Sequence, residues 1–135
     1  MWLSGGAAIG FSAVFLASLW RGVGGLAVHD LGVLGVAAVA LALSLAVSGV
    51  LAVVAVVVAE WVAIAPTVAK ALHDPESETA STWAIDMIAG LCAVAAVAQL
   101  SAVELLYPIN HAVLNAVVVG AIIAGRHGQR GLAPA

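Results

Sequence analysis

The sequence predicts an all-α fold, a multi-pass transmembrane helix bundle. Hydrophobic residues make up 64% of the 135 positions and charged residues only 8%, whereas about 25% of a soluble domain is charged. The run from Leu31 to Leu72 holds only two charged side chains, Glu60 and Lys70. Several stretches are apolar at every position, unlike the alternating pattern of a β-barrel strand. We therefore expect one integral membrane domain, residues 1–135, with four helices.

The first helix is expected over residues 4–20. Trp2 and Trp20 flank it, and Trp favours the headgroup level of a bilayer. The two indoles would be about 27 Å apart at ~1.5 Å per residue, close to the thickness of the hydrocarbon core. We interpret the segment as a retained helix, because no Lys or Arg precedes it and no clear cleavage site follows it.

The long apolar run that follows has two interpretations. In the first, one helix covers 31–59 and residues 61–72 lie along the membrane surface. In the second, the chain folds back near Gly49, which gives five helices and places Glu60 in the middle of a crossing. Trp61 favours the first interpretation because Trp prefers the interface, whereas the distribution of basic residues favours the second. We expect the first, with four helices.

Two more helices are expected over residues 84–106 and 109–125. Aromatic residues flank the first of them, and Pro108 separates the two, because a proline disfavours helical conformation in the residue before it. Residues 126–135 are expected to form a polar tail.

Three carboxylates make a candidate path for ions or protons. Asp86 and Glu104 are 18 residues apart, or five turns at ~3.6 residues per turn, so one continuous helix would carry both on one face. Glu60 joins them if the chain folds back. The alternative, which we favour from the sequence, is that Asp86 and Glu104 reach headgroup water about one turn from each membrane surface.

A polar cluster surrounds the expected break at Pro108. Its members are Glu104, Tyr107, Asn110, His111 and Asn115. A histidine beside a carboxylate can shuttle a proton, hold a quinone by a hydrogen bond or ligate a metal. The alternative is that these side chains satisfy the backbone groups that the proline frees.

Small residues recur every four positions in the last expected helix, at Ala112, Ala116, Gly120 and Ala124. Such a row lets another helix approach closely. We expect it to be a helix-packing seam, which would serve either packing within the chain or oligomerisation.

Composition and motifs also exclude some functions. The net charge of −3 comes without a basic patch, which argues against a nucleic-acid partner. A single cysteine excludes an internal disulfide, and no phosphate loop or nucleophile motif is present. We predict no cofactor and no metal site, and an enzyme is disfavoured.

Three functions remain. The expected one is a small structural or accessory membrane protein, as a subunit of a larger assembly or a membrane component of an enveloped particle. The alternative is a small oligomeric proton- or ion-coupled transporter or channel that uses Glu60, Asp86 and Glu104. The third is a membrane oxidoreductase or lipid-modifying subunit built around Glu104 and His111. Expected partners are the lipid bilayer and further copies or subunits. Composition suggests a prokaryotic cell membrane, with the C-terminus cytoplasmic.

Overall fold

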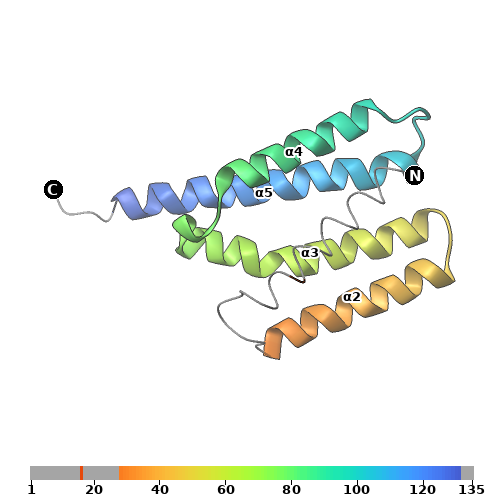
Figure 1. Cartoon of the computed structure of the whole chain (residues 1–135), viewed down its shortest axis with the longest axis horizontal. Coiled ribbons are helices and arrows are strands. Elements are labelled where there is room, and N and C mark those ends of the chain that lie inside the picture. The colour runs from red at the N-terminus through yellow and green to blue at the C-terminus, as the bar shows by residue number, and fades with distance from the viewer. Residues whose placement is uncertain (1–15, 17–27, 132–135) are drawn as a thin grey trace. The chain divides into compact units, whose positions relative to one another are not determined.

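The computed structural model describes Leu16 and residues 28–131, so the helix expected over 4–20 lies outside the described residues apart from Leu16. The chain forms two compact units, 1–32 and 33–135. The described residues contain four α-helices, a single 3-10 turn and no strand, which confirms the all-α prediction for this part of the chain (Figure 1). The elements are α2 (Val28–Ala46), α3 (Val50–His73), η1 (Pro75–Ser77), α4 (Ala80–Ala95) and α5 (Ala102–Gly131).

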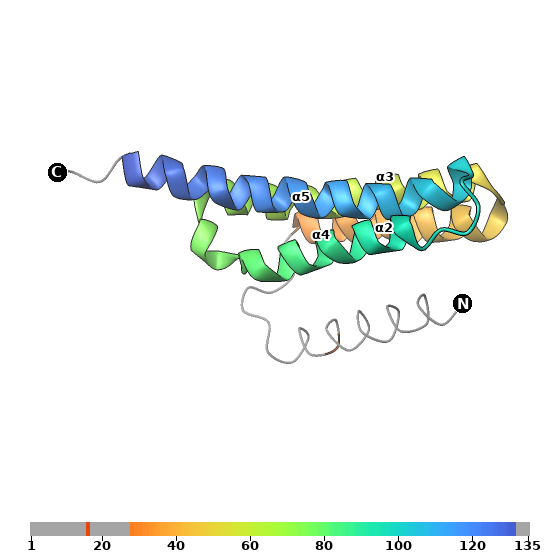
Figure 2. The ribbon, with the colours of Figure 1, turned by 90° about the horizontal axis from the view of Figure 1, so that it is seen from above.

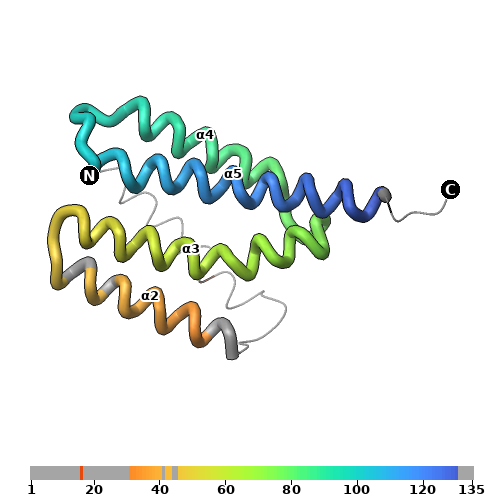
Figure 3. The backbone as a smooth tube through the Cα atoms, turned by 180° about the vertical axis from the view of Figure 1, so that it is seen from behind, coloured from red at the N-terminus to blue at the C-terminus, as the bar shows by residue number. Residues whose placement is uncertain are grey.

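The long apolar run is divided at Gly49, so the expected single helix over 31–59 is wrong. Gly49 has φ 67° and ψ −140°, a backbone conformation that side-chain-bearing residues rarely adopt and glycine adopts readily. The chain reverses direction there between α2 and α3 (Figures 1 and 3). Residues 61–72 continue α3 without interruption, instead of forming the separate surface segment that Trp61 suggested.

The boundary between α4 and α5 also differs from the expectation of helices over 84–106 and 109–125. Helix α4 ends at Ala95, and α5 begins at Ala102. The backbone N–H of Glu104 donates a hydrogen bond of 3.3 Å to Ser101 Oγ, which caps the helix start in the manner of a Ser-x-x-Glu capping sequence.

Helix α5 runs through Pro108 and continues to Gly131. Pro108 lies near the exposed start of the helix, and the carbonyl that it leaves without a donor belongs to the exposed residue Glu104. At the other end, residues expected in the tail 126–135 extend the helix as far as Gly131, because Arg126 and Gln129 bond to neighbouring elements. Residues 132–135 lie outside the described residues.

Helix α5 packs against both α3 and α4, parallel to α3 and antiparallel to α4 (Figures 1 and 2). Two glycines make these contacts close. A Cβ placed on Gly90 of α4 would stand 2.8 Å from the backbone nitrogen of Ala112. A Cβ on Gly125 would stand 2.5 Å from the carbonyl oxygen of Ala71. Both positions therefore require the absence of a side chain.

The packed core is small. Its cluster of buried side chains consists of Ala71, Val118, Ala121 and Ile122, with Ile64, Val68, Ala80 and Trp83 against it, and Ala40, Ala112 and Leu114 are buried outside this cluster. Many large apolar side chains remain exposed, such as Leu51 at 68% and Leu100 at 85%. Two helices, Val50–His73 and Ala102–Arg130, are long and apolar enough to span a membrane. Large exposed apolar patches are typical of surfaces that contact other proteins or a membrane.

We predict that alanine at Gly90 or at Gly125 lowers the free energy of unfolding by about 1–3 kcal/mol, because the added methyl group overlaps the backbone of the facing helix. Thermal unfolding of the detergent-solubilised protein, followed by circular dichroism, measures the effect.

Gly120→Ala is the matched control. A Cβ placed on Gly120 would have no neighbour within 4 Å, and alanine is the better helix former by up to about 1 kcal/mol. We expect this variant to be as stable as the parent or slightly more so. Equal losses in all three variants would contradict the assignment of Gly90 and Gly125 as close-contact positions.

Candidate functional site

Glu60 lies in the middle of α3, a 24-residue apolar helix. Residues 50–59 precede it in α3 and residues 61–73 follow it. At ~1.5 Å per residue, Glu60 is about 15 Å from the start of the helix, which is half the thickness of a bilayer core. Its side chain is half-buried. The nearest charged residue along the helix is Lys70.

Asn110 of α5 is the partner of this carboxylate. Its Nδ2 donates a hydrogen bond of 2.7 Å to Glu60 Oε2, and its Oδ1 accepts one of 2.8 Å from Trp61 Nε1. The Asn110 side chain thus bridges two consecutive residues of α3. Only 8% of Asn110 is exposed, and both of its polar groups are satisfied, as a buried amide requires.

Two more members of the predicted cluster face the same carboxylate. Tyr107 and His111 both lie close enough for their polar groups to interact with Glu60. Their rings are stacked on each other, with 6.1 Å between centroids. The spacing of the pair, one helical turn, places both on the side of α5 that Asn110 also occupies. Together with Trp61, they surround Glu60 with aromatic and polar groups.

The remaining predicted members, Asn115 and Glu104, have local roles. Asn115 is 3% exposed, and its Nδ2 donates a hydrogen bond of 2.7 Å to the carbonyl oxygen of His111, one turn earlier. Glu104 is exposed, and its backbone takes part in the cap at Ser101. Among the described residues no hydrogen bond or ion pair joins Glu104 to His111.

The three predicted path carboxylates occupy three different helices, so Asp86 and Glu104 do not share a helix face. Their levels along the bundle can still be compared. Gly90 of α4 contacts Ala112 of α5, which places Asp86 about 9 Å beyond Asn110 at ~1.5 Å per residue. Glu104 lies about 9 Å before Asn110 by the same measure. Asp86 is half-buried and makes no side-chain hydrogen bond with the described residues.

The predicted small-residue seam has one buried member. Ala112 is 6% exposed and contacts Gly90, whereas Ala116, Gly120 and Ala124 are exposed. Packing within the chain uses the neighbouring row instead, which consists of Leu114, Val118, Ala121, Ile122 and Gly125. The exposed part of the seam is free to meet another helix.

Sequence reasoning missed two features of this site. It placed Trp61 at the membrane interface, whereas the indole nitrogen finds its hydrogen-bond acceptor on α5. It also kept Glu60 apart from the Asn110 cluster, because the two residues are 50 positions apart in the sequence. The possible chain reversal at Gly49 was the sequence signal from which the proximity of Glu60 to this cluster could have been predicted.

The arrangement is suited to holding a proton or a small cation. A carboxylate, an amide and two aromatic residues with polar atoms converge on one point in an apolar environment. Among the described residues no three His, Cys, Asp or Glu side chains are grouped so as to hold a metal ion. Comparison of the chain with protein-family models, curated proteins and solved structures found no match.

We predict that Asn110→Ala lowers the free energy of unfolding by about 1–3 kcal/mol, because Glu60 and the indole N–H of Trp61 both lose a buried partner. Combining Asn110→Ala with Glu60→Ala should cost less than the sum of the two single changes, with a coupling of about 0.5–3 kcal/mol. Chemical denaturation in detergent measures each corner of the cycle.

The control cycle pairs Asn110→Ala with Asp86→Ala. No hydrogen bond joins these two side chains among the described residues, so their effects should add to within about 0.5 kcal/mol. Additivity in the Glu60 cycle as well would contradict the bridge between α3 and α5.

Proposed function

We propose that this chain is an integral membrane protein that moves protons or small cations by way of Glu60, with α3 and α5 crossing the bilayer. The observation that carries the proposal is the position of Glu60 at the centre of a 24-residue apolar helix, hydrogen-bonded to the buried Asn110. An ionisable side chain at that depth is costly, faces a partner or a cavity, and in membrane proteins marks ion and proton pathways.

The order of the polar groups along the bundle supports a path through this site. Glu104 lies on one side of the Glu60 level and Asp86 on the other, each about 9 Å away. Tyr107 lies in the first interval on α5, and His111, stacked on it, lies one residue past Asn110. Histidine titrates near neutral pH and is a common proton carrier. A proton that enters near Glu104 would meet exchangeable groups before it reaches Glu60.

A structural role is the second candidate, and a different observation favours it. The row Ala116, Gly120 and Ala124 is exposed on α5, and small residues of this kind allow helices of neighbouring subunits to approach. The sequence argument for a structural protein assumed that Glu60 sits at the membrane surface, an arrangement that the continuous helix α3 does not support. The transport role is therefore the first proposal.

We predict that Glu60→Gln slows proton flux by about 10²-fold or more, since a positioned proton carrier contributes at least that factor. Glutamine keeps an oxygen that can accept the Asn110 hydrogen bond, so the fold should be preserved. Flux is measured in liposomes loaded with a pH-sensitive dye, with a potassium diffusion potential as the driving force.

Glu78→Gln is the matched control, because Glu78 lies in the loop before α4 and pairs with Lys70 at 3.5 Å, away from the path. It should transport as the parent does, whereas Asp86→Asn and Glu104→Gln should be slowed. If proton flux through the parent protein is no greater than that of empty liposomes, the transport proposal is contradicted and the structural one remains.

We also predict that α3 crosses the membrane. In a Cys92→Ser background, an impermeant maleimide should label Ser48→Cys and Ser77→Cys rapidly but from opposite sides of the membrane. Glu60→Cys should be protected, because the centre of a spanning helix is out of reach of water. Rapid labelling of position 60, or labelling of positions 48 and 77 from the same side, would contradict the crossing.

A further inference from the structure

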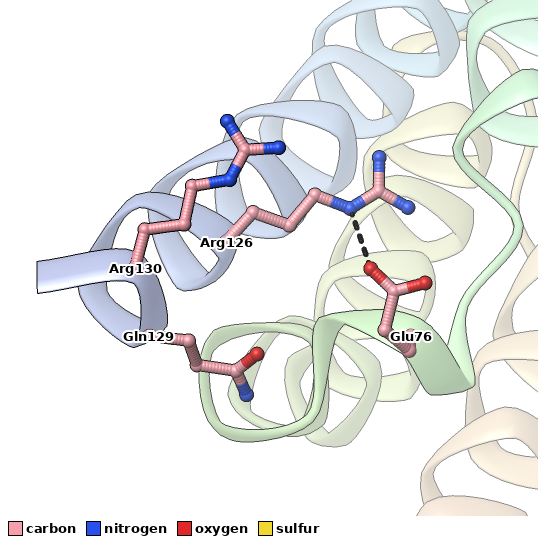
Figure 4. A pocket seen from close by; sticks show the side chains of 4 residues that line it. All are labelled: Glu76, Arg126, Gln129 and Arg130. Carbon is pink, nitrogen blue, oxygen red and sulfur yellow. Dashed lines mark hydrogen bonds and ion pairs between the residues drawn. The ribbon is translucent and has the colours of Figure 1, made fainter. Parts of the chain in front are cut away.

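A cavity of about 350 Å³ opens at the end of the bundle where α5 finishes (Figure 4). Its walls are Glu76 of η1 and three residues of the last turns of α5, namely Arg126, Gln129 and Arg130. The three α5 residues are spaced i, i+3 and i+4, so they share one face of the helix. Both arginine side chains project from that side (Figure 4).

Contacts to two other elements hold the cavity walls in place. Arg126 Nε donates a hydrogen bond of 3.0 Å to Glu76 Oε1. Gln129 Nε2 donates one of 3.2 Å to the carbonyl oxygen of His73, at the end of α3. Within the described part of the chain Arg126 bonds through its Nε alone, so the two terminal nitrogens of the guanidinium can donate to a ligand.

The charges of the lining match an anion with one negative charge. Two arginines and one glutamate give the lining a net formal charge of +1. The planar guanidinium group donates parallel hydrogen bonds that fit the oxygens of a phosphate. A phosphodiester carries one negative charge and would make the site neutral, whereas a zwitterionic headgroup would leave the positive charge in place.

The position of the cavity along the chain points to a lipid. The apolar part of α5 ends at Gly125, one residue before Arg126. Three of the four Lys and Arg residues of the whole chain, Lys70, Arg126 and Arg130, lie at the ends of α3 and α5. If α3 and α5 span the bilayer, as the proposed function requires, this cavity lies at the level of the lipid phosphates.

We propose that the cavity lined by Glu76, Arg126, Gln129 and Arg130 binds the headgroup of an anionic phospholipid, with its phosphodiester on the two arginines. Clusters of basic residues beside a membrane helix attract the anionic leaflet, and here the bound phosphate has a formed site. The inference rests on the membrane location of the proposed function, but not on transport through Glu60.

The test is a titration of the purified protein with phosphatidylglycerol in detergent, read by native mass spectrometry. We expect one tightly retained phosphatidylglycerol on the parent protein and weaker retention of phosphatidylcholine. Arg130→Gln should weaken phosphatidylglycerol binding by about fivefold or more, the equivalent of the ~1 kcal/mol that one basic residue contributes at an anionic surface. The double variant with Arg126→Lys and Arg130→Lys should weaken phosphatidylglycerol binding less, because both positive charges stay and only the planar guanidinium groups are lost.

Lys70→Gln is the matched control. It removes one positive charge at the same end of the bundle, from a side chain that does not line the cavity. The affinity of this variant for phosphatidylglycerol should stay close to that of the parent. An equal loss of affinity in Lys70→Gln and Arg130→Gln would overturn the site and indicate general electrostatic attraction. Displacement of the lipid by millimolar inorganic phosphate would overturn the lipid assignment and make free phosphate the ligand.

Proton flux through the same variants separates this inference from the proposed function. Arg130→Gln should retain flux, which also shows that it is folded. Retained flux with unchanged lipid binding overturns the lipid site alone. In a third outcome, the parent protein binds lipid but shows no flux, and Arg130→Gln loses the lipid. That result supports the lipid site and contradicts the transport role.

Discussion

The contact between α3 and α5 is the constraint on which the rest of the described structure depends. At one end of the contact between the two helices, the Asn110 side chain joins Glu60 and Trp61. Near the other, Gly125 lies directly against the carbonyl groups of Ala71 and Leu72. A hydrogen-bonded bridge and a close backbone contact together fix the two helices in one register. Without that register the carboxylate at the centre of α3 would face an apolar environment unpaired, at a cost of several kcal/mol.

The same contact explains why so little of the apolar surface is buried. Helix α5 uses one side for the polar residues that face α3 and a second side for α4, so its third side remains open. The core cluster that results joins four buried side chains of the described residues to four partly buried neighbours. In water this would be a poor fold, because hydrophobic burial is the main driving force. If the helices lie in lipid, as proposed, close packing and hydrogen bonds hold them together instead, and this structure contains both.

Composition was sufficient to predict the all-α fold of the described residues, and the sequence around Pro108 pointed to Tyr107, Asn110 and His111, which the structure brings to Glu60 instead of Glu104. The incorrect predictions came from rules that describe only the average preferences of a residue type. Trp61 was assigned to the interface because an indole N–H needs a polar partner, but Asn110 supplies that partner inside the bundle. Pro108 was expected to end a helix, yet it lies near a helix start, where the loss of one hydrogen bond is tolerated.

Two of the chain reversals among the described helices, between α2 and α3 and between α4 and α5, involve single residues whose meaning is set by tertiary structure. Gly49 resembles any glycine of an apolar helix until its positive φ is known, and Ser101 acts through one hydrogen bond to the backbone of Glu104. The contact between Glu60 and Asn110 spans 50 positions, so no local pattern contains it.

The acidic Glu60 and the basic residues of the described chain lie at different levels along α3 and α5, and this separation links the two proposals. Among the described residues, the carboxylate of Glu60 is held at mid-length of α3 by a neutral amide, and no lysine or arginine pairs with it. The cations of the described chain lie at the shared end of α3 and α5, where Lys70 and Arg126 pair with Glu78 and Glu76. A cation beside Glu60 would hold it permanently ionised and would compete with any transported ion. Basic residues at one end also favour one orientation in a membrane. If α3 and α5 span the bilayer as proposed, this separation leaves the central acid available to a proton and places the charged end at the lipid surface.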